Sequence, residues 1–283
     1  MLFFGENNAI LHTFPNFQLD YFDKSNPYQR WTDRISSIEG NLNIFSFYNK
    51  VINTISNTIP EPFKLNQDLS RVDTSGNMVI ALREAILNML MHADYYGSSP
   101  IVANVFINYY EFTNPGKMKI SPKDFFTTNN SKTRNPIISK LFIQMGKGER
   151  AGHGGEKIYE SAINNDYRVP IINTDNKQTK LKIWKVDYAD SFSGEEISER
   201  EREILKCIVS NGSRELSHKQ IEDETKLSRS IVSRTLSSLI EKGIIIKSGN
   251  ARSTKYGILH TEEQLFAQLQ VMPSILRKMI NNK

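Results

Sequence analysis

Hydrophobic side chains recur at helical spacing in two segments of the first half of the chain. From residue 42 to residue 59 they fall every three or four positions, until Pro60 and Pro62 interrupt the pattern. A second run extends from residue 77 to about residue 93. Both patterns predict amphipathic helices, the first of about four to five turns.

Shorter strands and helices surround these two segments. The chain predicts strands at Ala9–Phe14 and Phe17–Phe22, a strand or tight hairpin at Ile101–Thr113, a helix at Pro136–Met145, a Gly-rich run at Gly146–Gly155 followed by a helix through Ala162, and a strand at Lys180–Val186. The turns include Pro15-Asn16 and Asn114-Pro115-Gly116. This mixture predicts an α+β fold.

The last part of the chain predicts three consecutive helices and two strands. Ser198 precedes the first helix, which Asn211-Gly212 ends; Ser217 caps the second, His218–Thr225; and the third, Arg229–Lys242, ends at Gly243. An apolar strand at 244–247, a polar basic loop at 248–253 and a returning strand at 254–258 follow. The order predicts a winged helix-turn-helix domain.

We therefore divide the chain into two domains. The expected parts are an α/β domain at 1–187 with a lead-in segment at 1–70, a linker at 188–195, a winged helix at 196–260, and a C-terminal amphipathic helix at 261–283. Tyr188–Gly194 is the expected linker because it is polar and of low hydrophobicity. Packing of the last helix on its own domain and pairing with a second copy are equally compatible with its pattern.

The composition is that of an ordinary globular protein, with 39% hydrophobic and 24% charged residues among 283. Disordered and collagen-like classes are therefore excluded. The single cysteine, Cys207, cannot form an internal disulfide, and no apolar run is long enough to span a membrane. We expect a cytoplasmic protein with no membrane partner. The net charge of +5 permits an anionic partner, and residues 196–260 hold 12 Lys and Arg against 9 Asp and Glu.

One polar stripe in the second helix is a candidate chemical site. Glu84, Asn88 and His92 follow one another at intervals of four, so they share one helix face. An Asn oxygen is an acceptable Mg²⁺ ligand, and a Glu can orient or deprotonate a water molecule. The alternative is a polar stripe on a half-buried helix, which the spacing by itself favours.

The segment Ala81–Tyr95, which contains this stripe, resembles the N-box helix of the GHKL-type ATPase-like domain found in RecG-related, Schlafen/AlbA-associated bacterial proteins. Further matches follow in order at Thr113-Asn114-Pro115-Gly116, Arg134-Asn135-Pro136 and Glu149–Gly154. Upstream, Leu2-Phe3-Phe4-Gly5 with Phe14-Pro15 resembles the segment that follows the Schlafen/AlbA domain. That resemblance implies a fragment or a shortened member of the family, without the Schlafen/AlbA domain.

The resemblance implies a two-layer α/β sandwich and a set of nucleotide-binding residues. In it Asn88 is the Mg²⁺ ligand and Glu84 the general base, and the full nucleotide-binding set is Asn88, His92, Asn114, Gly116, Gly152, Gly154 and Gly155. The adenine motif Asp-x-Gly-x-Gly is replaced by Asn114-Pro115-Gly116-Lys117-Met118, without its Asp and second Gly. ATP with Mg²⁺ is therefore the cofactor the resemblance allows, and efficient hydrolysis is not expected. The chain lacks a G-x-x-x-x-G-K-[ST] motif, which argues against a helicase.

Residues 226–246 resemble the recognition-helix region of winged-helix regulators of the MarR type. The polar face of the third helix and the wing supply the expected contacts to double-stranded DNA: Arg229, Ser230, Ser233, Arg234, Ser237, Arg252 and Lys255. We expect a DNA-binding transcriptional regulator that acts as a homodimer, with a degenerate GHKL-like domain that senses a small ligand, such as a nucleotide, or mediates dimerisation. The alternatives are an ATP-binding protein with weak Mg²⁺-dependent ATPase activity and a non-catalytic protein-interaction module.

Overall fold

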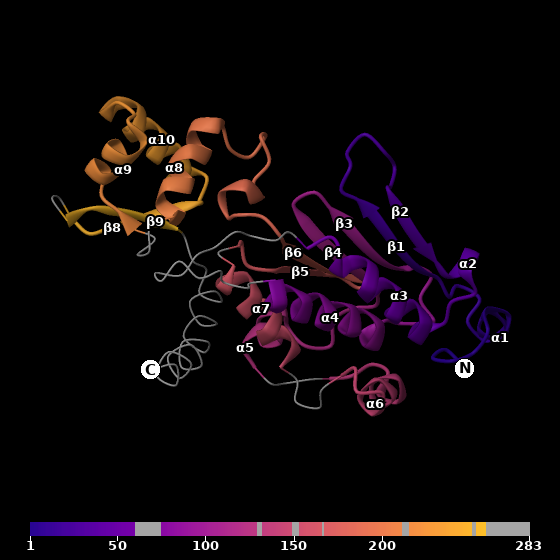
Figure 1. Ribbon diagram of the computed structural model, residues 1–283. Helices are drawn as coiled ribbons and strands as arrows, with labels where there is room; N and C mark the ends of the chain where they lie inside the picture. Colours follow the sequence, from indigo (N-terminus) through magenta and orange to yellow (C-terminus); the bar gives the residue numbers. More distant parts are fainter. Residues whose placement is uncertain are drawn as a thin grey trace. The chain divides into compact units, whose positions relative to one another are not determined.

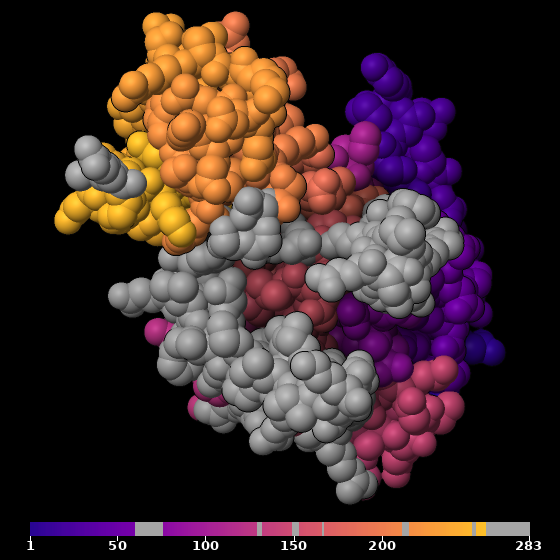
Figure 2. All heavy atoms as spheres, turned by 60° about the vertical axis from the view of Figure 1, so that its left-hand side comes forward, coloured from indigo at the N-terminus to yellow at the C-terminus, as the bar shows by residue number. Residues whose placement is uncertain are grey.

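The structure, a computed structural model, describes residues 1–59, 75–128, 132–148, 153–165, 167–210, 215–250 and 253–258. The described residues form two compact units, one up to Lys185 and the other from Val186 on. Figure 1 shows the elements of both units, and in Figure 2 the residues of the second unit are orange to yellow. No helix within the described ranges combines the length and the apolar character needed to cross a bilayer.

A six-stranded sheet forms the framework of the first unit. Its strands are β1 (Leu19–Lys24), β2 (Asp33–Ser36), β3 (Ile101–Phe106), β4 (Tyr109–Pro115), β5 (Ile171–Thr174) and β6 (Gln178–Trp184), in the order β2-β1-β3-β4-β6-β5. β1 and β3 are parallel, whereas the other neighbours are antiparallel. This mixed sheet with its helices is compatible with an ATPase-like sandwich.

The main helices of the first unit lie on one side of this sheet (Figure 1). They are α3 (Ile44–Ser56), α4 (Ser75–His92), α5 (Pro122–Thr127), α6 (Pro136–Gln144) and α7 (Gly154–Asn164), and two shorter helices, α1 (Asn7–Thr13) and α2 (Ser37–Gly40), lie near the N-terminus. Apolar residues of α3 and α4 and the inward-facing residues of the strands, such as Tyr21, Val105 and Phe112, form one core. Burial of this apolar surface is the main force that holds the helices on the sheet.

Local sequence signals explain where several of these helices begin. Asn43 and Ser46 form a reciprocal capping box at α3, with the Asn43 side chain accepting from the Ser46 backbone N–H. Ser121 caps α5 by accepting from Asp124 N, and Pro122 and Pro136 stand in the first turns of α5 and α6. Proline is tolerated there because its missing N–H would have no helical partner.

The N-terminal strand expected at Ala9–Phe14 is wrong, because residues 9–13 belong to helix α1 and Phe14 is its C-cap. Helix α1 buries Ile10. The Asn7 backbone N–H donates to Asn41 Oδ1 and its side-chain Nδ2 donates to the Ser37 carbonyl oxygen, which fixes the start of the helix. A short apolar run has no decisive period, and its tertiary contacts select the helix. The strand expected at Phe17–Phe22 is present as β1, and Ile101–Thr113 is a hairpin, β3–β4. The short elements β2, β5 and α5 were not predicted.

The second unit consists of helices around a small sheet. It contains α8 (Glu199–Ser210), α9 (His218–Thr225), α10 (Arg229–Glu241), β7 (Glu215–Leu216), β8 (Ile245–Ser248) and β9 (Lys255–Ile258), with strand order β7-β9-β8. Ser217 caps α9 as predicted, and the structure adds a reciprocal capping box with Gln220. The buried side chains of α8, α9, α10 and the strands form a second core.

The residues expected to form a linker, 188–195, instead pack into the second unit. They contain a short 3₁₀ helix, η1 (Ala189–Ser191), and Ala189 and Phe192 belong to the core of this unit. Arg202 of α8 donates hydrogen bonds to the carbonyl oxygens of both residues, at 2.5 and 2.9 Å. The low hydrophobicity of the segment concealed these two apolar anchors. The helix expected at 261–283, and Gly152 and Arg252, lie outside the described residues.

Candidate functional site

The polar stripe of α4 borders a cavity of about 180 Å³ in the first unit. Glu84, Asn88 and His92 all line it, so the interval of four does place them together. The opposite side of α4 packs into the core through buried residues such as Leu82 and Leu90. Other candidates from the sequence also reach the cavity, namely Asn114 of β4 and Gly154 and Gly155 of α7.

Glu84 and Asn88 contact each other directly. The Asn88 Nδ2 atom donates to Glu84 Oε1 at 3.1 Å and to the Glu84 carbonyl oxygen at 3.0 Å. Because the amide nitrogen is engaged in this way, the amide oxygen Oδ1 is the atom of Asn88 suited to a cation. A Mg²⁺ ion would find only this oxygen and the Glu84 carboxylate as hard donors from the α4 stripe, so phosphate oxygens and water would have to complete its coordination.

Two glycines allow α7 to lie close to its neighbours. A Cβ atom added at Gly154 would stand 2.1 Å from Glu84 Oε1, and one added at Gly155 would stand 1.8 Å from the Phe125 carbonyl oxygen. A side chain at Gly154 would displace the Glu84 side chain, and one at Gly155 would require a shift of the Phe125 backbone. The structure therefore explains both glycines by packing, and the N-terminal turn of α7 thereby lies next to Glu84.

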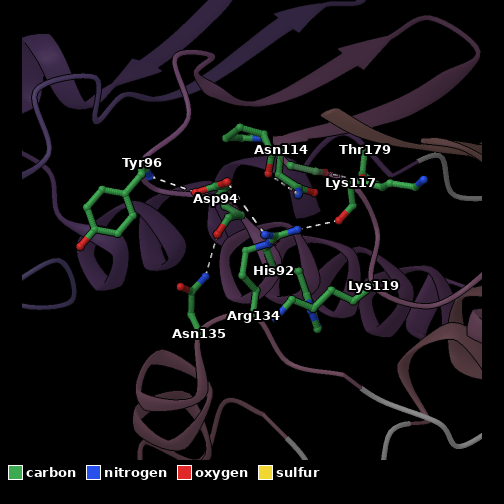
Figure 3. Close-up of polar contacts among 12 residues, drawn as sticks. His92, Asp94, Tyr96, Asn114, Lys117, Lys119, Arg134, Asn135 and Thr179 are labelled. Carbon is green, nitrogen blue, oxygen red and sulfur yellow. Dashed lines mark hydrogen bonds and ion pairs between the residues drawn. The ribbon is translucent and has the colours of Figure 1, made fainter. Parts of the chain in front are cut away.

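Arg134 and Asn135 hold the C-terminal end of α4 (Figure 3). Asn135 Nδ2 donates to the Met91 and Ala93 carbonyl oxygens at 3.0 and 2.7 Å, and Arg134 Nε donates to the His92 carbonyl oxygen at 3.0 Å. Carbonyl groups at a helix end lack helical partners, so these side chains act as its cap. The sequence motif had included both residues without giving them a role.

The turn at 114–116 closes the same end of the site. Arg134 Nη2 donates to the Lys117 carbonyl oxygen at 2.6 Å, and Arg134 Nη1 lies 3.9 Å from Asp94 Oδ2. Gly116 has a φ of +96°, and an added Cβ would approach Arg134 Nη2 to 3.0 Å. Gly116 is thus a turn residue at the rim and is not among the residues that line the cavity.

Thr179 of β6 is a polar cavity residue that the sequence did not reveal. Its hydroxyl group donates to the Gly116 carbonyl oxygen at 2.9 Å and lies 3.0 Å from Thr174 Oγ1. Buried Asn114 is on the neighbouring strand, and its Nδ2 lies 3.3 Å from the Pro115 carbonyl oxygen. Together these groups place a hydroxyl and an amide on the inner face of the sheet (Figure 3).

The lining of the cavity is cationic. Lys117, Lys119, Lys132, Arg134 and Lys157 contribute to it, whereas Glu84 is the carboxylate among the described lining residues. Burial, followed by the charges of Arg134 and Lys119, lowers the pKa of His92 from 6.5 to about 4. His92 is therefore neutral at pH 7. The excess of positive charge favours an anionic ligand.

The protein side chains at this site do not by themselves complete the coordination of a metal ion. Within the described part of the chain, three or more His, Cys, Asp or Glu side chains never gather closely enough to hold a metal ion. The pair Glu84 and Asn88 fits a Mg²⁺ ion that reaches the site with phosphate groups. It does not constitute a complete protein site for a metal.

A second group of candidates lies on α10 in the second unit. Arg229, Ser230, Ser233, Arg234 and Ser237 are all exposed, while Val232, Leu236 and Leu239 are buried on the other side of the helix. This arrangement agrees with the polar face predicted from the sequence. Lys255, at the start of β9, is exposed as well.

One serine of this face is held by a neighbouring helix. His218 of α9 contacts Glu222 Oε1 through Nδ1 at 2.6 Å and Ser233 Oγ through Nε2 at 2.8 Å. The contact orients the Ser233 hydroxyl group and fixes α9 against α10. Helix α10 is therefore a supported helix with a Ser- and Arg-containing surface.

Part of the first unit, which contains the six-stranded sheet and the cavity, is similar to a known protein family. Residues 98–183, from just before β3 to the penultimate residue of β6, match the protein family described as "Putative ATP-dependent DNA helicase recG C-terminal". The chain thus contains a domain similar to the RecG C-terminal, ATPase-like family, in agreement with the resemblance found in its motifs.

Comparisons with curated proteins and with solved structures give little further information about this chain. The search of curated proteins gave no match. The crystal structure of the DIP2311 protein from Corynebacterium diphtheriae is 13% identical to this chain, with a TM-score of 0.46. The similarity covers 86% of this chain and 58% of that one, so the chain spans less than two thirds of that protein.

Proposed function

We propose that the first unit binds a nucleotide in the cavity beside α4. The observation that supports this proposal is the concentration of Lys117, Lys119, Lys132, Arg134 and Lys157 around a cavity that also contains Asn88 and Asn114. Such a lining offers cations to phosphate groups and amide groups to a base. The match of residues 98–183 to an ATPase-like family favours a purine nucleotide among the possible anions.

Hydrolysis is expected to be slow at best. Glu84 is the general base under this proposal, but its carboxylate accepts from Asn88 and faces the first turn of α7. The adenine contact falls to Asn114, which gives a weaker hydrogen bond than a carboxylate would. Mg²⁺ bound by Asn88 Oδ1 would supply charge neutralisation to the phosphates. Ligand sensing is therefore favoured over turnover.

Titration calorimetry with ATP and with ADP, each in the presence and absence of Mg²⁺, tests this proposal. We expect binding that weakens about tenfold or more for Lys119→Gln, since each lost charge removes a contact worth about 1.5–3 kcal/mol. Lys123→Gln is the matched control, because Lys123 is exposed on α5 and does not line the cavity. No heat with either nucleotide would refute nucleotide binding, and equal affinity in the two variants would refute its placement in this cavity.

A second function is favoured by a separate observation, the surface of α10. We propose that the second unit is a winged helix that binds double-stranded DNA, with α10 in the major groove and Lys255 at a phosphate. Three helices followed by β8 and β9, and the coincident exposure of Arg229, Ser230, Ser233, Arg234 and Ser237, support this proposal. The whole chain would then be a regulator in which ligand binding alters the affinity for DNA.

Fluorescence anisotropy with labelled duplex DNA at several salt concentrations tests the DNA proposal. We expect affinity that falls steeply with salt and that is lost in Arg229→Ala/Arg234→Ala. Lys123→Ala/Lys140→Ala removes the same charge from exposed positions of the first unit and serves as the control. If both double variants bind alike, or no duplex binds at low salt, the second unit is better explained as a protein-interaction module.

Winged-helix proteins usually engage two half-sites, so we also propose that the chain acts as a homodimer. Light scattering after size exclusion, at the protein concentrations of the anisotropy assay, measures the mass directly. A monomer that binds DNA with full affinity would refute this part of the proposal.

A further inference from the structure

The outer face of the six-stranded sheet is unusually rich in aromatic and cationic side chains. Helices α3, α4 and α7 pack on the inner face, where Tyr21, Tyr110 and Phe112 point. Alternate residues point to opposite faces of a sheet, so the strand register assigns the outer ones. Directly paired outer residues include Phe22 with Arg34, Tyr109 with Trp184, and Glu111 with Lys182.

One group forms a row across three strands. Phe106 of β3 lies next to Tyr109 of β4, with ring centroids 4.6 Å apart, and Tyr109 lies next to Trp184 of β6 at 5.3 Å. Lys182 Nζ stands over the Tyr109 ring at 4.2 Å, and Arg168 stands over the Trp184 ring at 5.0 Å. The row therefore alternates π surface with positive charge.

A second group continues the pattern on β1 and β2. The rings of Phe22 and Trp31 lie 5.7 Å apart, and Arg34 stands over both, at 5.5 and 5.7 Å. Arg30 stands over Trp31 at 4.5 Å. Lys24 joins the two groups, because its Nζ lies 5.0 Å from the Phe22 ring and 5.6 Å from the Phe106 ring.

The charges on this face have few partners of opposite sign. Asp20 and Glu111 are the carboxylates that the register places on the outer strand positions. Arg34 is paired, to Glu39 and, at 3.8 Å, to buried Asp20. Lys24, Arg30 and Lys182 stand over rings, where their charge is retained. The face has the complementary charge for a polyanion.

We propose that this face binds single-stranded nucleic acid. Unpaired bases would stack on the half-buried rings of Phe22, Trp31, Phe106 and Tyr109, while Lys24, Arg30 and Lys182 contact phosphates. A duplex cannot use the rings in this way, because its bases are already stacked on one another. Among polyanions, therefore, the interleaved rings specifically favour an unpaired strand. The inference does not depend on the cavity or on α10.

The two tryptophans of the chain provide a direct reporter, since Trp31 and Trp184 both lie in these groups. Titration of the full-length chain with a 20-nucleotide oligothymidylate should quench its tryptophan fluorescence, and anisotropy of the same labelled oligomer gives the affinity. Trp31→Phe separates the two signals. A duplex of equal length is the competitor, and we expect it to displace the single strand poorly.

Variants then locate the binding surface. We expect Tyr109→Leu, which removes one stacking ring, to weaken binding of the single strand about 5-fold to 100-fold. Lys24→Gln/Lys182→Gln should weaken it as well and reduce its salt dependence, because two phosphate contacts are lost. Lys123→Gln/Lys140→Gln is the control of equal charge. Circular dichroism confirms that each variant is folded.

Arg229→Ala/Arg234→Ala separates this surface from α10. Affinity for the single strand that survives in this variant and falls in the sheet variants supports the proposal. Three results would overturn it: no quenching and no anisotropy change with oligothymidylate, equal binding by the sheet variants and their control, or loss of single-strand binding only when α10 is changed.

Discussion

Glu201→Gln is the substitution whose effect can be worked out most fully from the structure. Glu201 of α8 is 4% exposed, and its carboxylate accepts hydrogen bonds from Ser198 N at 2.6 Å, Ser238 Oγ at 2.7 Å and Lys242 Nζ at 2.7 Å. Burial raises the pKa of such a group, but the hydrogen bonds from Lys242, Ser198 and Ser238 outweigh it and lower the pKa from 4.5 to about 2. The charged form thus joins α8 to the C-terminal half of α10.

The size of the effect follows from linkage. A pKa about 2.5 below the ordinary value corresponds to about 3 kcal/mol of stability for the second unit. The folded state holds the proton less tightly than the unfolded state, so this contribution is complete above about pH 5 and is lost as the pH falls toward 2. Glu201→Gln should therefore cost about 3 kcal/mol at pH 7, less than half of that at pH 3, and almost nothing below pH 2.

Hydrogen exchange measured by mass spectrometry on peptides from α8 and α10 reports the stability of this unit within the whole chain. A loss of about 3 kcal/mol corresponds to exchange about 100-fold faster at pH 7, after correction for intrinsic rates. Glu199→Gln is the control, since the Glu199 side chain is 89% exposed on the same helix. Equal protection in the two variants at pH 7, or a difference that persists unchanged to pH 3, would show that the carboxylate network does not stabilise the unit as argued.

Three predictions concern the first unit, whose unfolding by urea can be followed through Trp31 and Trp184. Gly155→Ala should destabilise it by about 3 kcal/mol, because the new Cβ would meet the Phe125 carbonyl oxygen at 1.8 Å and the backbone there would have to shift. Gly76→Ala on α4, with nothing within 4 Å, should be neutral or stabilising, and similar effects of the two substitutions would contradict the packing argument. Asn135→Ala should lower the free energy of unfolding by about 1–2 kcal/mol, because two hydrogen bonds to the end of α4 are lost. The control Asn173→Ala, at an exposed position of β5, should change it little. Equal stability of the two variants would mean that the cap does not stabilise the unit. His92 should titrate near pH 4 by NMR, and Arg134→Gln should raise that pKa. The unfolded chain takes up this proton near pH 6.5 and the folded chain only near pH 4, so the first unit should lose stability as the pH falls from 6.5 to 4. The loss of stability over this range should be smaller in His92→Gln. A His92 titration near pH 6.5 would refute the burial argument.

The sequence predicted the long elements because their patterns were long enough to have a period. The helices α3 and α4 each extend over three turns or more, and their apolar stripes match the core that the structure shows. The alternation of residues 101–113 predicted one strand or a tight hairpin, and the structure contains the hairpin β3–β4. The segments that failed were short: α1 has a single fully buried residue, Ile10, and β5 has four residues at the sheet edge. Only their tertiary contacts determine their conformation.

The candidate site was predictable where its residues share one helix and not where they come together from several. Glu84, Asn88 and His92 could be placed together by helical spacing, and Asn114 by its motif. Thr179 and the lysines of the lining lie on a strand, on loops and on helix α7, with no periodic relation to α4. Their convergence depends on the strand order, in particular on β6 lying between β4 and β5. Residues 188–195 show the same limit, because their polar composition concealed two residues that belong to the second core.

The strand register also makes the two activities proposed for the first unit separable. Along β6, Thr179 and Leu181 line the cavity, while Lys182 and Trp184 belong to the outer face or its row of rings. Along β4, Asn114 and Phe112 line the cavity and Tyr109 is on the outer face. Because neighbouring positions point to opposite sides, substitutions one or three residues apart on one strand should affect different ligands. Thr179→Val should weaken nucleotide binding and leave the single strand unaffected, and Lys182→Gln should do the reverse. If each substitution lowered the affinity for both ligands equally, the two faces would be coupled through the sheet. The assignment of one ligand to each face would then have to be abandoned.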